Sequence, residues 1–137
     1  MRANNVGSVR LPSILACALT LAACAAGDAD APPLPQAPTP AGATVFTARP
    51  DLLDPHPVAI TSWSPAGDGI AVHFETGTPE CYGVDATLTE TDSAVAVALE
   101  GGTLPEAADR MCIQIAVTGV LELPLRAPLA GRTVTAG

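Results

Sequence analysis

Apolar and polar residues alternate in short runs between Val58 and Leu123, and this pattern constrains the fold more than any other feature of the chain. Successive side chains of a β-strand point to opposite faces, so a period of two is typical of strands with one buried face. No stretch has the 3.6-residue period of an amphipathic helix of useful length. We therefore predict an all-β fold, a small antiparallel β-sandwich or barrel.

The expected strands are short and separated by turn residues. The sequence predicts them over residues 58–63, 70–75, 84–89, 95–99, 113–123 and 133–135, with a further edge strand at 45–46. Gly119 interrupts the alternation of the long strand, where we expect a β-bulge. Pro50, Pro55 and Pro57 exclude a central strand before Val58, because proline cannot donate a hydrogen bond to a neighbouring strand.

The N-terminal segment has the features of a secretory signal. Arg2 and Arg10 precede an apolar core, Leu11–Leu21. The run of low polarity reaches only to about Ala26, short of the roughly 18–20 residues needed to span a bilayer. The run ends in the sequence LAAC at residues 21–24, which resembles the lipobox of bacterial lipoproteins. The resemblance implies that the chain is cut after residue 23 and that the thiol of Cys24 carries a diacylglyceryl group.

An ordinary secreted protein is the alternative, because Ala23-Cys24-Ala25 also fits an Ala-x-Ala cleavage site. The two alternatives differ in membrane attachment. Each buried methylene contributes roughly 0.8 kcal/mol to membrane binding, so two acyl chains hold a protein on a membrane, whereas a single chain binds only marginally. We favour the anchor at Cys24 and expect the protein on the extracytoplasmic face of the cell membrane.

This interpretation divides the chain into three parts. Residues 1–23 are the expected lipoprotein signal peptide. Residues 24–43 comprise the lipidated cysteine and a tether rich in proline and alanine, which we expect to be disordered because it has no apolar periodicity. Residues 44–137 form the expected β domain, which is long enough for one small domain.

The charge of the chain argues against nucleic acid as a partner. The formal net charge is −8 at pH 7, with 14 acidic residues, six arginines and no lysine. A chain without a basic cluster is poorly suited to bind nucleic acid or anionic lipid headgroups. The acidic residues are scattered, which is typical of a solvated surface.

Two cysteines remain once Cys24 is acylated and the signal peptide is removed. Cys81 and Cys112 form an even pair in an exported domain, which predicts a disulfide. There is no Cys-x-x-Cys motif that would favour a redox role. Trp63 and Tyr82 are expected to pack in the core, with a ligand-contact surface as the alternative.

The sequence contains no recognisable hydrolase or metal site. The histidines, His56 and His73, lack the spacing of zinc ligands, and we expect His73 on the outward, solvated face of its strand beside Glu75. The serines at 62, 64 and 93 have no convincing general base near them in the sequence. We predict no catalytic residue, no metal and no cofactor.

Paired carboxylates offer the weakest of the possible active sites. Glu90 and Asp92 fall at an expected hairpin tip, and Glu106 and Asp109 fall in an irregular connection. Carboxylates act as an acid–base pair only inside a cleft. We therefore expect all four to be solvated loop residues.

Several short segments of the domain resemble a family of small exported lipoproteins and secreted proteins of high-GC Gram-positive bacteria. The resemblance covers about residues 58–137 and is carried by Cys81–Val84, Thr89–Thr91, Cys112-Ile113 and Pro128–Val134. It brings no functional residue to this chain. We expect a binding or interaction module of the cell envelope that contacts an envelope protein, a wall polymer or a small ligand. The alternative is a small envelope enzyme built from scattered acidic residues, whereas the substrate-binding lipoprotein of a transporter usually needs two lobes.

Overall fold

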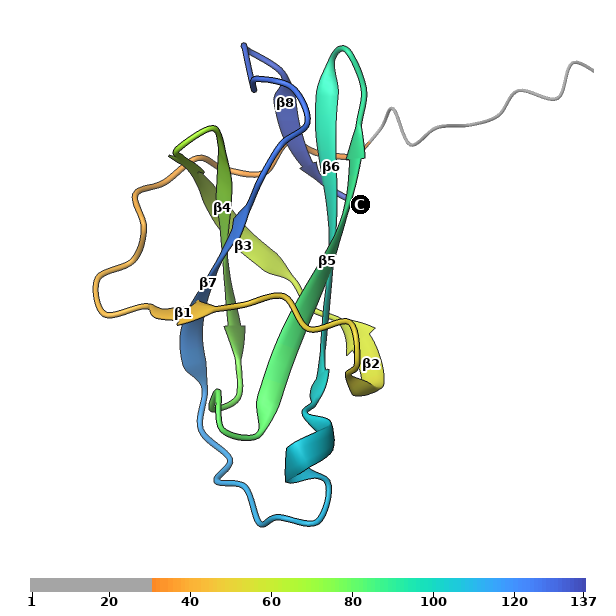
Figure 1. Cartoon of the computed structure of the whole chain (residues 1–137). Helices are drawn as coiled ribbons and strands as arrows, with labels where there is room; N and C mark the ends of the chain where they lie inside the picture. Colours follow the sequence, from red (N-terminus) through yellow and green to blue (C-terminus); the bar gives the residue numbers. More distant parts are fainter. Residues whose placement is uncertain (1–30) are drawn as a thin grey trace, which may run out of the picture.

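Two four-stranded sheets pack face to face in the computed structural model, which describes residues 31–137 (Figure 1). The strands are β1 (Thr44–Phe46), β2 (Leu53–Pro57), β3 (Ile60–Ala66), β4 (Gly69–Thr76), β5 (Tyr82–Glu90), β6 (Ala94–Thr103), β7 (Val117–Leu123) and β8 (Thr133–Ala136). A 3-10 helix, η1 (Pro105–Ala107), follows β6. The prediction of an all-β fold is confirmed, and of the two alternatives, sandwich or barrel, the structure is a sandwich.

The strand directions differ from the prediction at two edges. One sheet has the order β1-β7-β4-β3, and the other has the order β2-β6-β5 with β8 also paired to β6. β1 runs parallel to β7, and β8 runs parallel to β6, so both sheets are mixed rather than antiparallel. Alternation of apolar residues reports which face of a strand is buried and says nothing about strand direction. The proline-bearing β2 lies at an edge, as expected.

The core lies between the two sheets and is built mainly from aliphatic side chains. One sheet contributes Ile70, Val72, Phe74 and Leu121, and the other contributes Val84, Val95, Val97 and Leu99. The ring centroids of Phe46 and Phe74 lie 5.6 Å apart, and the angle between the two ring planes is 58°. Trp63 is part of this cluster, so its expected role in packing is confirmed.

Gly119 forms no bulge. It pairs in unbroken register with Phe74 on β4 and with Thr44 on β1. A β-carbon at this position would overlap the Phe74 ring and approach the Phe46 ring. The glycine therefore makes room for the aromatic pair instead of interrupting the ladder.

The expected long strand over residues 113–123 begins only at Val117. Ile113 and Ile115 are 63% and 54% exposed, and residues 111–116 run without a turn or a bend into β7. β4 ends at Thr76, which pairs with Val117, so no neighbouring strand extends beside the preceding residues. Residues 113–116 therefore have the alternation of a strand but remain unpaired, because β4 is too short to lie beside them.

Part of the expected tether is ordered. The amide of Leu34 donates to the carbonyl of Val134 at 2.8 Å, and the amide of Ala37 donates to the carbonyl of Trp63 at 2.9 Å. The Trp63 indole also donates to the carbonyl of Leu34 at 3.1 Å. The prediction of disorder up to residue 43 is wrong for this segment, because an extended proline-rich chain can still supply donors and acceptors to a sheet edge. Cys24 and the signal peptide lie outside the described residues.

The described chain enters at one end of the sandwich, and the connection between η1 and β7 lies at the other (Figure 1). Pro33 bridges to Thr135 on β8, and β8 pairs with the first residues of β6. β6 has ten residues and is therefore about 33 Å long. η1 follows the last residues of β6, at the end of the strand opposite to β8. Within residues 31–137, no helix is long and apolar enough to cross a membrane.

Candidate functional site

Three of the five exposed large apolar side chains of the described domain lie on the segment Met111–Ala116, which we call the apolar loop. Met111 is fully exposed, and Ile113 and Ile115 keep more than half of their surface in solvent. The intervening side chains are tied to the domain: Cys112 bonds to Cys81, and the exposed Gln114 donates to the Tyr82 hydroxyl at 3.1 Å. The loop is thus fastened to the domain at Cys112 and Gln114, while its large apolar side chains stay in solvent.

The disulfide between Cys81 and Cys112 is present, which confirms the predicted pairing. Its α-carbons lie 6.2 Å apart, and the bridge closes a segment with a sequence separation of 31 residues. Cys81 belongs to a small second core with Leu104 and Ala107, against which Leu52, Tyr82 and Cys112 pack. The bridge therefore holds the apolar loop against a buried cluster below the main core.

A shallow groove of about 440 Å³ runs beside the loop. Its apolar lining comes mainly from Val58, Ile113 and Ile115, and Tyr82, His56 and Glu75 also line it. Glu75 is exposed and lies near the end of β4, and its carboxylate has no hydrogen bond or ion pair within residues 31–137. The groove thus combines apolar walls with a carboxylate that is free to meet a cation.

His73 is buried, in contrast to the expected solvated position. It points away from the main core as predicted, but its exposure is 0%. Its ring nitrogens lie 2.8 Å from the Ser62 hydroxyl and 3.1 Å from the Ser64 hydroxyl. Thr39, on the segment that leads from the β3 edge to β1 (orange in Figure 1), contacts Ser64 at 3.2 Å. The N-terminal segment that the sequence assigned to a tether thus lies against this polar cluster.

Burial lowers the pKa of His73, because the interior disfavours the imidazolium form. The folded chain then binds fewer protons than the unfolded chain once the pH falls below about 6.5, the ordinary histidine value. We expect the free energy of unfolding to fall as the pH decreases from 7 to 5, above the range where carboxylates titrate. Denaturant unfolding at several pH values measures this. His73→Gln should flatten the dependence and the matched exposed control, His56→Gln, should keep it; equal slopes in wild type and His73→Gln would contradict the assignment.

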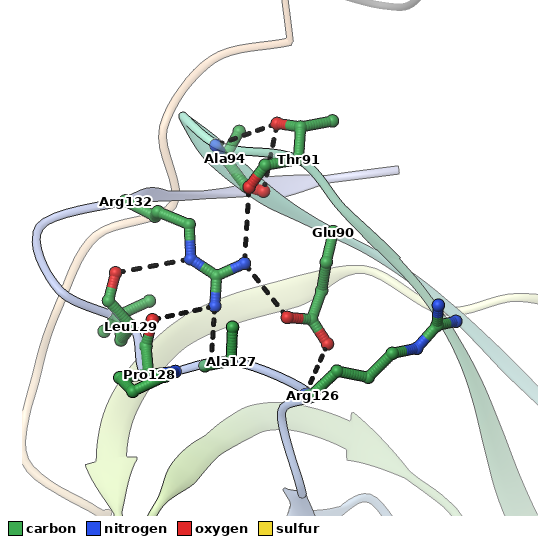
Figure 2. A network of polar contacts seen from close by, with 8 residues as sticks. All are labelled: Glu90, Thr91, Ala94, Arg126, Ala127, Pro128, Leu129 and Arg132. Atoms are coloured by element: carbon green, nitrogen blue, oxygen red, sulfur yellow. Dashed lines mark hydrogen bonds and ion pairs between the residues drawn. The ribbon is translucent and has the colours of Figure 1, made fainter.

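Glu90 is not a solvated hairpin residue. Figure 2 shows its carboxylate held between the backbone amide of Arg126, at 2.8 Å, and the guanidinium of Arg132, at 2.9 Å. The side chains of Arg132 and Glu90 are only 8% and 9% exposed. Arg132 also donates to the carbonyls of Ala127 at 2.7 Å and Pro128 at 3.0 Å. The expectation failed because the loop before β8 folds over the β5–β6 hairpin, a contact that local sequence does not reveal.

This network stabilises the fold rather than forming a reactive site. The amide of Arg126 and then the guanidinium of Arg132 hold the pKa of Glu90 below its usual range. A carboxylate that stays ionised and has both oxygens bonded is a poor general acid or base. The network joins the hairpin to the loop that leads into β8.

Removing the Arg132 guanidinium leaves the Glu90 carboxylate without its ion-pair partner. We expect Arg132→Met to lower the thermal unfolding midpoint clearly, because a nearly buried charge loses its compensation. Arg126→Met is the matched control, since the Arg126 side chain is exposed and Glu90 bonds only to its backbone. Differential scanning calorimetry compares the two. An equal, small effect of both substitutions would show that the network contributes little.

Glu106, another of the carboxylates expected in loops, shares an arginine with Asp51 rather than pairing with Asp109. Glu106 and Asp51 both accept hydrogen bonds from the Arg49 guanidinium, at 3.0 Å and 2.9 Å in their shortest contacts. These hydrogen bonds lower the pKa of both carboxyl groups and raise that of Arg49. The described part of the chain contains no group of three or more histidine, cysteine or acidic side chains placed to hold a metal ion.

Sequence reasoning missed the exposure of the apolar loop. Ile113 and Ile115 fall in the long strand predicted over residues 113–123, where they would share one face with Val117. The signal that could have revealed the loop is Cys112, since a disulfide within the alternating run fixes which side faces the domain. Comparison of the chain with protein-family models, with curated proteins and with solved structures gave no match.

Proposed function

We propose that this protein is a lipid-anchored binding module of the extracytoplasmic envelope, whose β domain contacts a partner through the apolar loop and the adjoining groove. The exposed Met111, Ile113 and Ile115 carry this proposal. Leaving large apolar side chains in water costs free energy that burial against a partner recovers, at about 25 cal/mol per Å². Contiguous exposed apolar side chains in a folded domain typically mark a contact site.

The location rests on the N-terminal sequence and on the cysteine chemistry. The LAAC sequence ending at Cys24 supports lipid attachment after removal of residues 1–23. The disulfide between Cys81 and Cys112 is typical of proteins that fold outside the reducing cytoplasm. The resemblance to small exported lipoproteins agrees with both observations.

The orientation of the domain supports a partner that lies beyond the membrane surface. The described chain begins at the β8 end of the sandwich, seven residues after Cys24 in the sequence. The apolar loop lies at the opposite end, about one β6 length or about 33 Å further on. An anchor at Cys24 would therefore present the loop away from the bilayer.

A site-specific crosslinking experiment tests this proposal. A photoreactive amino acid at position 113, in the full chain produced in a bacterial envelope, should capture one defined envelope component. The same amino acid at position 45 is the control, because Val45 is 71% exposed but lies on β1, away from the loop. We expect the position-113 adduct to exceed the position-45 adduct at least tenfold. Equal capture at both positions, or none at 113, would contradict the proposed binding surface.

A further inference from the structure

We infer that the apolar loop, Met111–Ala116, binds by pairing as a β-strand with an extended peptide segment of the partner that alternates apolar and basic side chains. This inference rests on the function proposed above, because it specifies the partner of the same surface. Its three supports are the free backbone of the loop, the way the disulfide positions it, and the charge of the groove.

The backbone of the loop is available for pairing. Residues 111–115 make no backbone hydrogen bond within the described chain, and neither a turn nor a bend interrupts them. The loop continues directly into β7, which is already paired. Unpaired backbone groups beside an established strand are the ordinary template for strand addition.

Alternate residues of the loop are fastened to the domain. Cys112 is bonded to Cys81 and Gln114 to Tyr82, while Met111, Ile113 and Ile115 are exposed. Holding alternate residues in place lowers the entropy that binding must remove, so a short pairing can become stable. The two isoleucines line the groove, where apolar side chains of an added strand would pack between them and Val58.

The charge of the groove favours a basic peptide. Glu75 lines the groove and has no ionic partner in the described residues, and neither arginine nor lysine lines it. The formal net charge of the chain is −8 at pH 7. A second copy or an anionic lipid surface would bring like charge to this site, whereas lysine or arginine beside the apolar positions of a peptide would neutralise it.

Synthetic peptides test the inference on the full-length protein in detergent. The probes are capped octapeptides of alternating valine and lysine, of alternating valine and glutamate, and a valine–lysine peptide with alternate amides N-methylated. Titration calorimetry measures each dissociation constant. We expect the valine–lysine peptide to bind at least tenfold more tightly than the valine–glutamate peptide. N-methylation should weaken binding at least tenfold, because it removes the donors that pair with the loop.

Matched variants locate the binding. Ile113→Ser combined with Ile115→Ser should weaken the valine–lysine peptide more than tenfold, whereas Val45→Ser should leave it unchanged. Glu75→Gln should reduce binding about two- to fivefold, as expected for an exposed charge pair, and Glu122→Gln on β7 is its control. Hydrogen exchange of residues 112–115 should slow when the peptide binds.

Three results would overturn the inference. These are equal affinity for lysine and glutamate peptides, indifference to N-methylation, and self-association of the protein through the loop in sedimentation experiments. If position 113 captures a partner in the envelope while no peptide binds, strand addition is wrong and the proposed binding surface stands. If neither experiment gives a signal, both fail.

Discussion

Replacing Cys81 and Cys112 together by alanine should lower the free energy of unfolding by about 3.5–4 kcal/mol, the chain-entropy estimate for a loop of 31 residues. The physical reason is that the bridge restricts the unfolded chain far more than the folded one. A small domain is stable by only about 5–15 kcal/mol, so this loss removes a large share of the total. Replacing the cysteines also removes packing from the second core, in which Cys81 is only 4% exposed.

Urea unfolding of the wild type, the double variant and the reduced wild type measures the effect. Limited trypsin digestion provides a local control, because Arg110 is exposed and lies between the two cysteines. A cut there leaves fragments that stay joined until reductant is added. A double variant as stable as the wild type, or two free thiols in denatured protein prepared without reductant, would contradict the account.

The substitution Cys24→Ala should move the protein from the membrane to the soluble fraction almost completely. Alanine has no thiol to alkylate, so the acyl chains that supply roughly 0.8 kcal/mol per buried methylene are lost. The substitution leaves Ala23 and Ala25 in place, and with them an Ala-x-Ala site, so an ordinary signal peptidase can still remove the signal. Release therefore does not depend on lipoprotein processing.

Fractionation and immunoblotting of cells and medium measure the distribution. Ser93→Ala on the β5–β6 hairpin is a control that should stay with the membrane. If the wild type is already soluble, or if Cys24→Ala remains in the membrane after its signal has been removed, the lipid anchor is wrong. The first result would favour the secreted alternative.

The alternation of apolar residues was sufficient to predict an all-β fold, a sandwich or a barrel, because burial of one strand face is a local property. It predicted β4, β5 and β6 close to their actual places, and the cysteine pair predicted the disulfide. It could not predict that β1 and β8 pair in parallel, since strand direction depends on how distant segments return to a sheet.

The candidate site was harder to predict because it depends on where strands stop. Ile113 and Ile115 have the pattern of buried residues and are exposed only because β4 ends at Thr76. His73 and Glu90 were assigned to solvent for the converse reason, since segments far away in the sequence cover them. In each case the reach of segments distant in the sequence, rather than the local pattern, decided which side chains are exposed.

The mass of the intact protein extracted from membranes with detergent tests the central claim most directly, because the proposed location and display of the domain depend on the lipid. The account predicts a mature chain that starts at Cys24 and carries the added mass of a diacylglyceryl group on that residue. A mature N-terminus at any other residue, or a membrane-extracted chain without added lipid mass, would contradict it.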